Sequence, residues 1–455
     1  MYAAKNTATK SNTNLVNILK FAIATILGFL LVVIPFNFDG TVDTISFYYL
    51  KLLKSSLGNV LTFTVVSVVA LSGIVSLITL LFKPKFILEN KTLKSLFSTT
   101  PFYVANRLIG GLIAILCFFN MGPEFIVSLD TGGTMLDLST QLSILIPPML
   151  FLQVLILEFG IMEFVGCLFG FIVKPLFKLS EFAAVNIISA WVGPGNAAII
   201  GTKQLFEEGF FTLREVAIIS TSFSISSIGW VVLVANVLDL MDVFGLFYFT
   251  ICATGAIVAF ITVRLRPITK IPNVYVDGST QYKNPKSDLA SKSNFDKALD
   301  LACDRASIVS YKNFTNKIPN ALSYVISLQP IIICWGTVAL ILSCYTPILQ
   351  WLSYPIGVIM NILNVPDAFV AAPAILSGFA DNYLPVILAK GLAPAEVRFI
   401  VGAMSILQLI FMSEIGALLI SNNIVTKFKD ILIIFLQRTL ISLPIVILVS
   451  KLIFG

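Results

Sequence analysis

The sequence predicts an all-α integral membrane protein with about nine transmembrane helices and two re-entrant helical hairpins in an inverted repeat. Three observations lead to this prediction: the hydropathy of the whole chain, two apolar segments that are broken in the middle, and the distribution of basic residues. Of the 455 residues, 57% are hydrophobic and 12% are charged, and the mean hydropathy is +0.94. These values lie far outside the range of soluble domains, so the chain is predicted to cross the bilayer many times.

Nine apolar segments are long enough to span, since a helix needs about 20 residues to cross a hydrocarbon layer of about 30 Å. The first follows three lysines, but no small-residue cleavage site follows Pro35, which favours a retained helix over a signal peptide. We expect a protein of the cytoplasmic membrane with a cytoplasmic N-terminus. The nine predicted spans cover residues 20–36, 57–82, 101–119, 142–158, 213–238, 244–263, 321–345, 398–420 and 431–450.

The segment 182–206, FAAVNIISAWVGPGNAAIIGTKQLF, has the form of a re-entrant hairpin. Its centre is the helix-breaking run Gly193, Pro194, Gly195 and Asn196, and an apolar arm lies on each side. An arm of roughly 11 helical residues reaches only about 16 Å, which is half the hydrocarbon thickness. Broken backbone at that depth is tolerated only beside protein or a watery cavity, so the kink is a candidate binding site.

The positions of the basic residues support this hairpin. The loop 83–100 carries four lysines and is predicted to be cytoplasmic, whereas the loop 119–140 carries three acidic residues and no Lys or Arg. If 182–206 crossed the membrane once, the ten basic residues of 264–320 would lie outside. A hairpin keeps them inside. The net charge of +6 is therefore attributed to topology, and no nucleic-acid partner is predicted.

A second segment, 368–391, repeats the plan of two short apolar arms around a polar kink. The kink runs from Gly378 to Asn382 and includes Asp381. Entry from outside would place the lysines at 427 and 429 in the cytoplasm, but two basic residues near 390–398 pull the other way. The orientation of this hairpin is left open.

The two hairpins belong to a longer repeated order of features. Each follows a Gly-, Phe- and Leu-rich apolar piece, at 160–178 and 347–364, and each is followed by the start of another helix. Thr212 and Glu215 form a capping-box pattern at the first of these starts. Paired repeats with interrupted helices are typical of secondary transporters, although a duplicated hairpin could also seal a helix bundle.

Candidate ligand groups are concentrated after the first kink. Ser220, Ser224 and Ser227 would share one face of a continuous helix at i, i+4 and i+7. Their hydroxyls, with backbone carbonyls freed at 193–196, could coordinate Na⁺ or bind a polar solute. Hydrogen bonding between helices or packing of small residues is the other interpretation.

A second group of polar residues lies in and after the second hairpin. Asp381 at the kink could bind a coupling cation or a substrate amine, or lie exposed in a loop. Asn382 lies beside it. Ser405 and Gln408 share a face of the next helix, where Glu414 would lie roughly 10 Å below the surface, either functional or wetted by the interface. Outside these groups, the charged side chains of Glu158, Glu163 and Arg107 are expected to reach the surface.

The same segments resemble the nucleoside-recognition (Gate) domain family and its YjiH-like branch. The resemblance is carried by GPGN and GFFTLREVAIISTSFSISS in the first unit, and by FADNYLPVILAKG, PAEVRF and SILQLIFMSEIGALL in the second. It covers roughly residues 140–450 and extends distantly to concentrative nucleoside transporters. It implies an inverted-repeat core in which two hairpin tips meet at a substrate site, but nothing in the chain reads as a base or ribose contact.

The predicted division has four parts. Residues 1–140 form an N-terminal three-helix region, 141–266 the first Gate repeat, 267–320 a cytoplasmic linker and 321–455 the second Gate repeat. In the linker, Phe295, Leu299, Ala302, Ala306 and Val309 have helical spacing, which predicts a short amphipathic helix. This helix would lie on lipid, bind a partner or connect the two repeats.

Taken together, these features predict a secondary transporter for a small polar organic solute, of which a nucleoside is one candidate, coupled to Na⁺ or H⁺. No cofactor is predicted. The chain has no histidine and shows no nucleophile with an adjacent base, and its six cysteines lack paired spacing, so an enzyme, a metal site or a disulfide framework is not expected. The alternative is a non-transporting scaffold or a subunit of a two-component membrane complex. Predicted partners are lipid, the solute, and a second copy or a second membrane subunit.

Overall fold

The structure is a computed structural model that describes residues 14–38, 40–180, 183–192, 195–224, 227–280, 294–412 and 414–455. The described chain is helical apart from one short antiparallel hairpin, β1 (Pro35–Phe38) and β2 (Thr41–Thr44), in which Pro35 pairs with Thr44. It divides into two compact units. The all-α prediction is confirmed.

The long-helix unit comprises residues 30–154 and 310–351. Glycines let its helices approach closely: a Cβ on Gly110 would lie 1.8 Å from the Pro330 carbonyl oxygen, and one on Gly111 would lie 3.1 Å from the Ala70 Cα. Its helices are α2 (Ile45–Phe82), α3 (Lys85–Glu89), α4 (Lys91–Phe97), α5 (Pro101–Phe119), α6 (Glu124–Val127), most of α7 (Gly132–Leu157), α15 (Tyr311–Thr315), α16 (Ile318–Ser323), the π-helical η3 (Tyr324–Leu328) and α17 (Gln329–Tyr345).

Arg107 in this unit is buried rather than at the surface, which corrects the sequence expectation. Its Nη1 donates to the Ser76 hydroxyl at 2.8 Å and to the Leu96 carbonyl at 2.7 Å. Leu96 lies in the last turn of α4, where carbonyls lack helical partners, so the guanidinium caps that helix.

The hairpin unit comprises residues 1–29, 155–309 and 352–455. The same order of elements occurs twice in it: a medium helix, two short helices, a broken helix and a long helix. The first series is α8 (Ile161–Phe177), α9 (Ala183–Val192), α10 (Gly195–Glu207), α11 (Leu213–Ser222), α12 (Ile228–Val237) and α13 (Phe244–Thr262). The second is most of α18 (Ile348–Ile362), α19 (Ala368–Ser377), α20 (Leu384–Lys390), α21 (Ala395–Leu407), α22 (Ile415–Ser421) and α23 (Phe428–Phe454).

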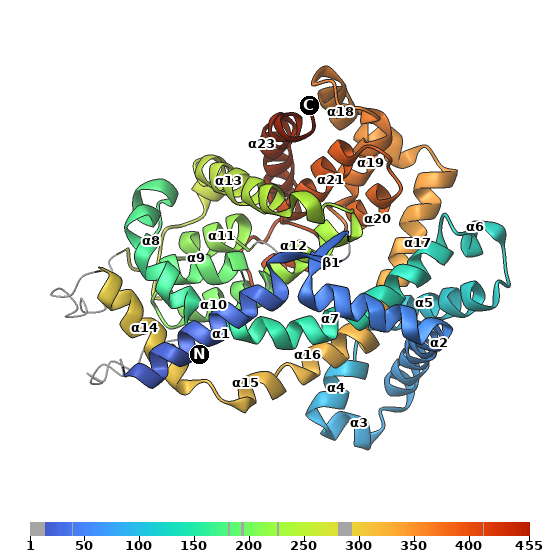
Figure 1. Cartoon of the computed structure of the whole chain (residues 1–455), viewed down its shortest axis with the longest axis horizontal. Helices are drawn as coiled ribbons and strands as arrows, with labels where there is room; N and C mark the ends of the chain where they lie inside the picture. The colour runs from blue at the N-terminus through green and yellow to red at the C-terminus, as the bar shows by residue number, and fades with distance from the viewer. Residues whose placement is uncertain are drawn as a thin grey trace. The chain divides into compact units, whose positions relative to one another are not determined.

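Two further α-helices and two 3₁₀ helices complete this unit: most of α1 (Leu15–Val32), α14 (Asn294–Ile308), η1 (Met241–Val243) and η2 (Ile268–Lys270). The two series pack against each other inside the unit. In Figure 1 the green helices lie beside the red ones, where α13 contacts α21 and α23, and α10 contacts α22. The boundaries of the predicted four-part division remain a prediction.

Within the described residues, seven helices are long and apolar enough to span a membrane, and they coincide with seven of the nine predicted spans. The other two predicted spans, 213–238 and 398–420, are each broken into two helices. In the first, α11 ends at Ser222 and α12 begins at Ile228, and in the second, α21 ends at Leu407 and α22 begins at Ile415. A multi-pass membrane protein with two interrupted crossings follows.

Local features accompany each interruption. The capping box predicted at Thr212 and Glu215 is present and starts α11. Six hydroxyl side chains between 220 and 227 compete with the helical ladder for backbone groups, which favours an early end. In the second break Leu409 has φ +67°, a left-handed conformation that costs a non-glycine residue about 1–2 kcal/mol and requires support from its surroundings.

The linker contains the predicted helix as α14, and its packing face agrees with the expected one at Ala302 and Ala306 but not at Phe295. Ala298, Ala302, Cys303 and Ala306 are buried, whereas Phe295 is exposed. The small side chains allow close packing on α8, and a Cβ on Gly160 would come within 2.5 Å of the Ala302 carbonyl oxygen. The helix therefore binds the hairpin unit through its small residues.

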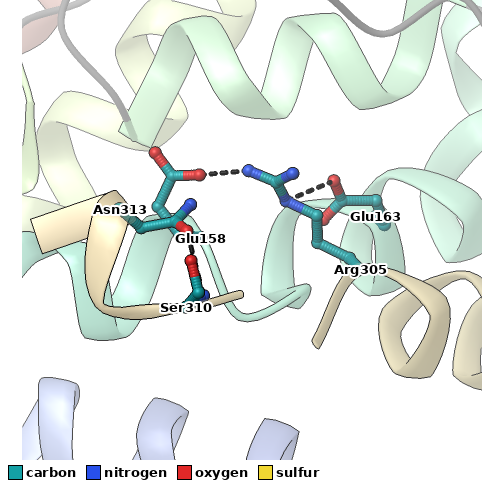
Figure 2. Close-up of polar contacts among 5 residues, drawn as sticks. All are labelled: Glu158, Glu163, Arg305, Ser310 and Asn313. Atoms are coloured by element: carbon teal, nitrogen blue, oxygen red, sulfur yellow. Dashed lines mark hydrogen bonds and ion pairs between the residues drawn. The ribbon is translucent and has the colours of Figure 1, made fainter. Parts of the chain in front are cut away.

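An acidic pair from the first series holds α14 in place. Figure 2 shows Arg305 of α14 between Glu158 and Glu163, with an ion pair to Glu158 and the Glu163 carboxylate 3.9 Å from its Nε. Both acids were expected at the surface, and both are largely covered. Burial raises the pKa of Glu163 to about 7, and the neighbouring Glu158 adds to the rise. In the same figure Asn313 accepts from the Ser310 backbone N–H at the start of α15.

Candidate functional site

The first hairpin is formed by α9 and α10, as predicted. Gly193 and Pro194 at its kink lie outside the described residues, and so does the side chain of Asn196. Gly195 begins α10, where a Cβ would lie 2.8 Å from the Ser224 carbonyl oxygen and 3.3 Å from Ile415 Cδ1. The hairpin tip therefore lies against both interruptions, the α11–α12 break through Ser224 and the α21–α22 break through Ile415.

The second hairpin is formed by α19 and α20, with its turn at 378–383. The Phe379 carbonyl in this turn accepts a hydrogen bond from the Met412 backbone N–H at 2.8 Å. The Phe379 ring packs on Phe435 of α23, with centroids 4.9 Å apart. Its tip is thus bonded to the same α21–α22 break that the first tip contacts.

The predicted acid of this turn has a local backbone role. Asp381 Oδ1 accepts from the Tyr383 backbone N–H at 2.8 Å, which closes the turn as an Asx motif. Both Asp381 and its neighbour Asn382 are half-buried in the turn. The Tyr383 ring packs on Trp230 with centroids 5.5 Å apart, which joins the turn to α12.

Gln408 connects the break to the second hairpin. Its Nε2 donates to the Ile375 carbonyl of α19 and to the Thr439 hydroxyl of α23, both at 3.0 Å, and its Oε1 is a buried acceptor without a partner in the described chain. A Cβ on Gly378 would lie 2.1 Å from that oxygen. Ser405, the other residue predicted on this face, is buried and donates to the Gly402 carbonyl at 2.8 Å.

The three serines after the first hairpin do not share one helical face, because the helix ends at Ser222. Ser220 is the only one of them within α11, and its hydroxyl is buried with no partner among the described residues. Ser224 lies in the break and donates weakly to the Ile219 carbonyl at 3.4 Å, while Ser227 precedes α12. The break brings backbone groups, rather than a row of hydroxyls, to the first hairpin tip.

Glu414 is also placed differently from the sequence expectation. It was predicted on a continuous helix, but it lies in the α21–α22 break immediately before α22, with non-helical backbone angles. It is half-buried, two residues after Met412, which binds the second hairpin. Its position beside both tips keeps it a candidate ligand group.

Sequence reasoning missed Arg438, the largest fully buried side chain of the described residues. It lies in α23, and its guanidinium bonds to the ends of both broken helices. Nε and Nη2 donate to the Leu407 carbonyl at 3.0 and 2.8 Å, and Nη1 donates to the Thr221 carbonyl at 3.3 Å. A lone charge inside the apolar segment 431–450 was the available signal.

No family model matches the chain, so the resemblance to the Gate family remains a prediction. The uncharacterized protein BpOF4_10220 of Alkalihalophilus pseudofirmus is 35% identical over 443 residues, which cover 96% of this chain and 95% of the relative. The chain belongs to the family of that protein. The match extends over nearly the full length of both chains.

Two solved structures of CNTnw are similar in arrangement. One, in an inward-facing substrate-bound state, has a TM-score of 0.40 and 12% identity, and the match covers 99% of this chain and 95% of the other. The second, a variant in an outward-facing state, has a TM-score of 0.39 and 13% identity, covering 99% and 94%.

Proposed function

We propose that the protein is a secondary transporter that moves a small polar organic solute across the cytoplasmic membrane by alternating access, coupled to an ion gradient. The observation that carries this proposal is the meeting of both hairpin tips at the α21–α22 break, where Gly195 contacts Ile415 and Phe379 binds Met412. Interrupted helices in a membrane protein are tolerated where they line a cavity or are buried in protein.

The backbone supplies the chemistry of the proposed site. The starts of α10 and α22 bring helix-terminal N–H groups, and the ends of α11 and α21 bring helix-terminal carbonyls, of which those of Thr221 and Leu407 are bonded to Arg438. Such paired helix ends bind solute and ions in transporters built from discontinuous helices. A solute with both donor and acceptor groups fits this set better than an apolar one.

The proposed side-chain contacts come from the kinks and breaks. The contacts proposed for the first tip are Gly193, Pro194, Gly195 and Asn196, and those proposed for the second are Asp381 and Asn382. Ser220, Ser224, Ser227, Ser405, Gln408 and Glu414 border the two breaks. Movement of the hairpin unit relative to the remaining helices supplies the alternating access.

Uptake into proteoliposomes tests the proposal. Asn196→Ala and Asp381→Ala should each abolish solute uptake while membrane insertion and size-exclusion behaviour stay unchanged. Asp242→Ala is the matched control, because Asp242 is an exposed acid in the same unit, far along the chain from both kinks. Unchanged uptake in the two kink variants would contradict the assignment. A purified chain that moves no solute but copurifies with a second membrane protein would favour the scaffold alternative.

A further inference from the structure

Arg438 is a charged side chain placed entirely inside the hairpin unit. It lies near the middle of α23, a helix long and apolar enough to span the membrane, and none of its surface is exposed. Among the described residues, its guanidinium donates hydrogen bonds to two backbone carbonyls, those of Leu407 and Thr221. Among the described residues no ion pair includes it.

A buried charge of this kind is costly unless it is compensated. Here the compensation comes from helix ends. Leu407 is the last residue of α21 and Thr221 the last but one of α11, so both carbonyls belong to the final turns, which lack helical donors and carry negative partial charge. One guanidinium thus satisfies the carbonyl ends of both broken helices.

Carbonyl ends of broken helices are the groups that hold Na⁺ or H⁺ in transporters with discontinuous spans. In this chain the cationic position at those ends is already filled by a group fixed to α23. The hydroxyl of the next residue, Thr439, accepts a hydrogen bond from the Gln408 amide, which also donates to the Ile375 carbonyl of the second hairpin. The guanidinium is therefore fixed on the helix that also binds the second hairpin, so its charge cannot move aside to leave room for an ion.

We propose that the Arg438 guanidinium is a built-in cation that takes the place of a coupling Na⁺ at the ends of α11 and α21, so that the protein works without binding Na⁺. The inference rests on the proposed transport function and narrows its coupling ion. It assigns Arg438 as a positioning residue that supplies a fixed positive charge.

Sodium binding to the purified full-length protein tests this proposal without knowledge of the solute. Wild-type protein is expected to show no saturable ²²Na⁺ binding and the same thermal unfolding midpoint in NaCl as in choline chloride. Arg438→Gln removes the charge and frees two carbonyls. This variant is expected to gain Na⁺-dependent stabilisation, with a midpoint about 1–2 °C higher in NaCl at ten times its Kd.

Two control variants separate charge from fold. Arg438→Lys keeps a positive charge and should be as indifferent to Na⁺ as the wild type. Arg398→Gln removes an arginine of α21 that binds the Leu392 and Ala393 carbonyls, away from both breaks, and should gain no response to Na⁺.

Saturable Na⁺ binding by the wild type would overturn the proposal, whether or not Arg438→Gln folds. An Arg438→Gln variant that folds and ignores Na⁺, or a lysine variant that is stabilised by Na⁺, would overturn it too. A failure of solute uptake in every ionic condition would instead contradict the proposed function and leave the sodium measurements unaffected.

Discussion

Gly378→Ala should loosen the second hairpin from the break that it contacts. Gly378 has an ordinary right-handed backbone, φ −57° and ψ −20°, so an alanine is not strained there. The obstacle is Gln408, whose Oε1 would lie 2.1 Å from the new Cβ. Gln408 is 1% exposed and must move to admit the methyl group.

The size of the effect follows from the bonds that this movement breaks. The Gln408 amide loses its bonds to Ile375 and Thr439, each 3.0 Å long. At about 1 kcal/mol for each bond, the closed hairpin loses about 2 kcal/mol. That difference corresponds to roughly a 30-fold increase in the population of the open hairpin.

Hydrogen exchange measured by mass spectrometry on peptides covering 375–390 should report this increase as faster exchange of the α19 and α20 amides. Gly391→Ala is the matched control, because Gly391 ends the same hairpin, has a right-handed backbone and has no atom within 4 Å of a new Cβ. Equal exchange rates in the two variants would refute the role assigned to Gln408.

Three other predictions concern the first series. Gly195→Ala should displace the first hairpin tip and reduce uptake strongly, because its Cβ would lie 2.8 Å from the Ser224 carbonyl oxygen. Gly201→Ala is the control, since a Cβ there has open space on the same helix. Equal uptake by the two variants would contradict this prediction. Because the folded pKa of Glu163, about 7, exceeds its unfolded value, this residue makes the protein less stable as pH rises from about 4.5 to 7. Glu163→Gln should flatten that part of the curve of unfolding midpoint against pH, and an unchanged slope would show that another group causes it. Thr212→Ala removes the N-cap of α11 at a cost of about 1 kcal/mol. Hydrogen exchange of the first amides of α11 should become about fivefold faster. An unchanged exchange rate would show that the helix does not depend on this cap.

The sequence predicted the long spans and the hairpins because their signals are local. Apolar length identifies a span, and the Gly-Pro-Gly run at 193–195 identifies a turn. The two helix breaks could not be predicted in this way, since neither 223–227 nor 408–414 contains a glycine or proline. Their residues leave the helix because tertiary partners, such as Phe379 for Met412, satisfy the freed backbone groups.

The same limit applies to the candidate site. Gln408 was predicted from its polarity in an apolar helix, and the structure places it against the second hairpin. Arg438 was equally conspicuous as a charge, but its partners are carbonyls that become free only when α11 and α21 end early. Because its partners are backbone carbonyls, which every residue carries, no acidic residue in the sequence marks Arg438 as part of the site.

The most direct test of the central claim is uptake of a pooled set of small polar metabolites into proteoliposomes, with mass spectrometry of the lumen as the readout. The account predicts that at least one solute accumulates with the wild type and with Gly201→Ala. It also predicts that this accumulation is lost with Gly195→Ala, and that it is the same in sodium and in choline buffers. Accumulation of no solute by the wild type, or undiminished accumulation by Gly195→Ala, would contradict a transport site at the meeting point of the hairpin tips.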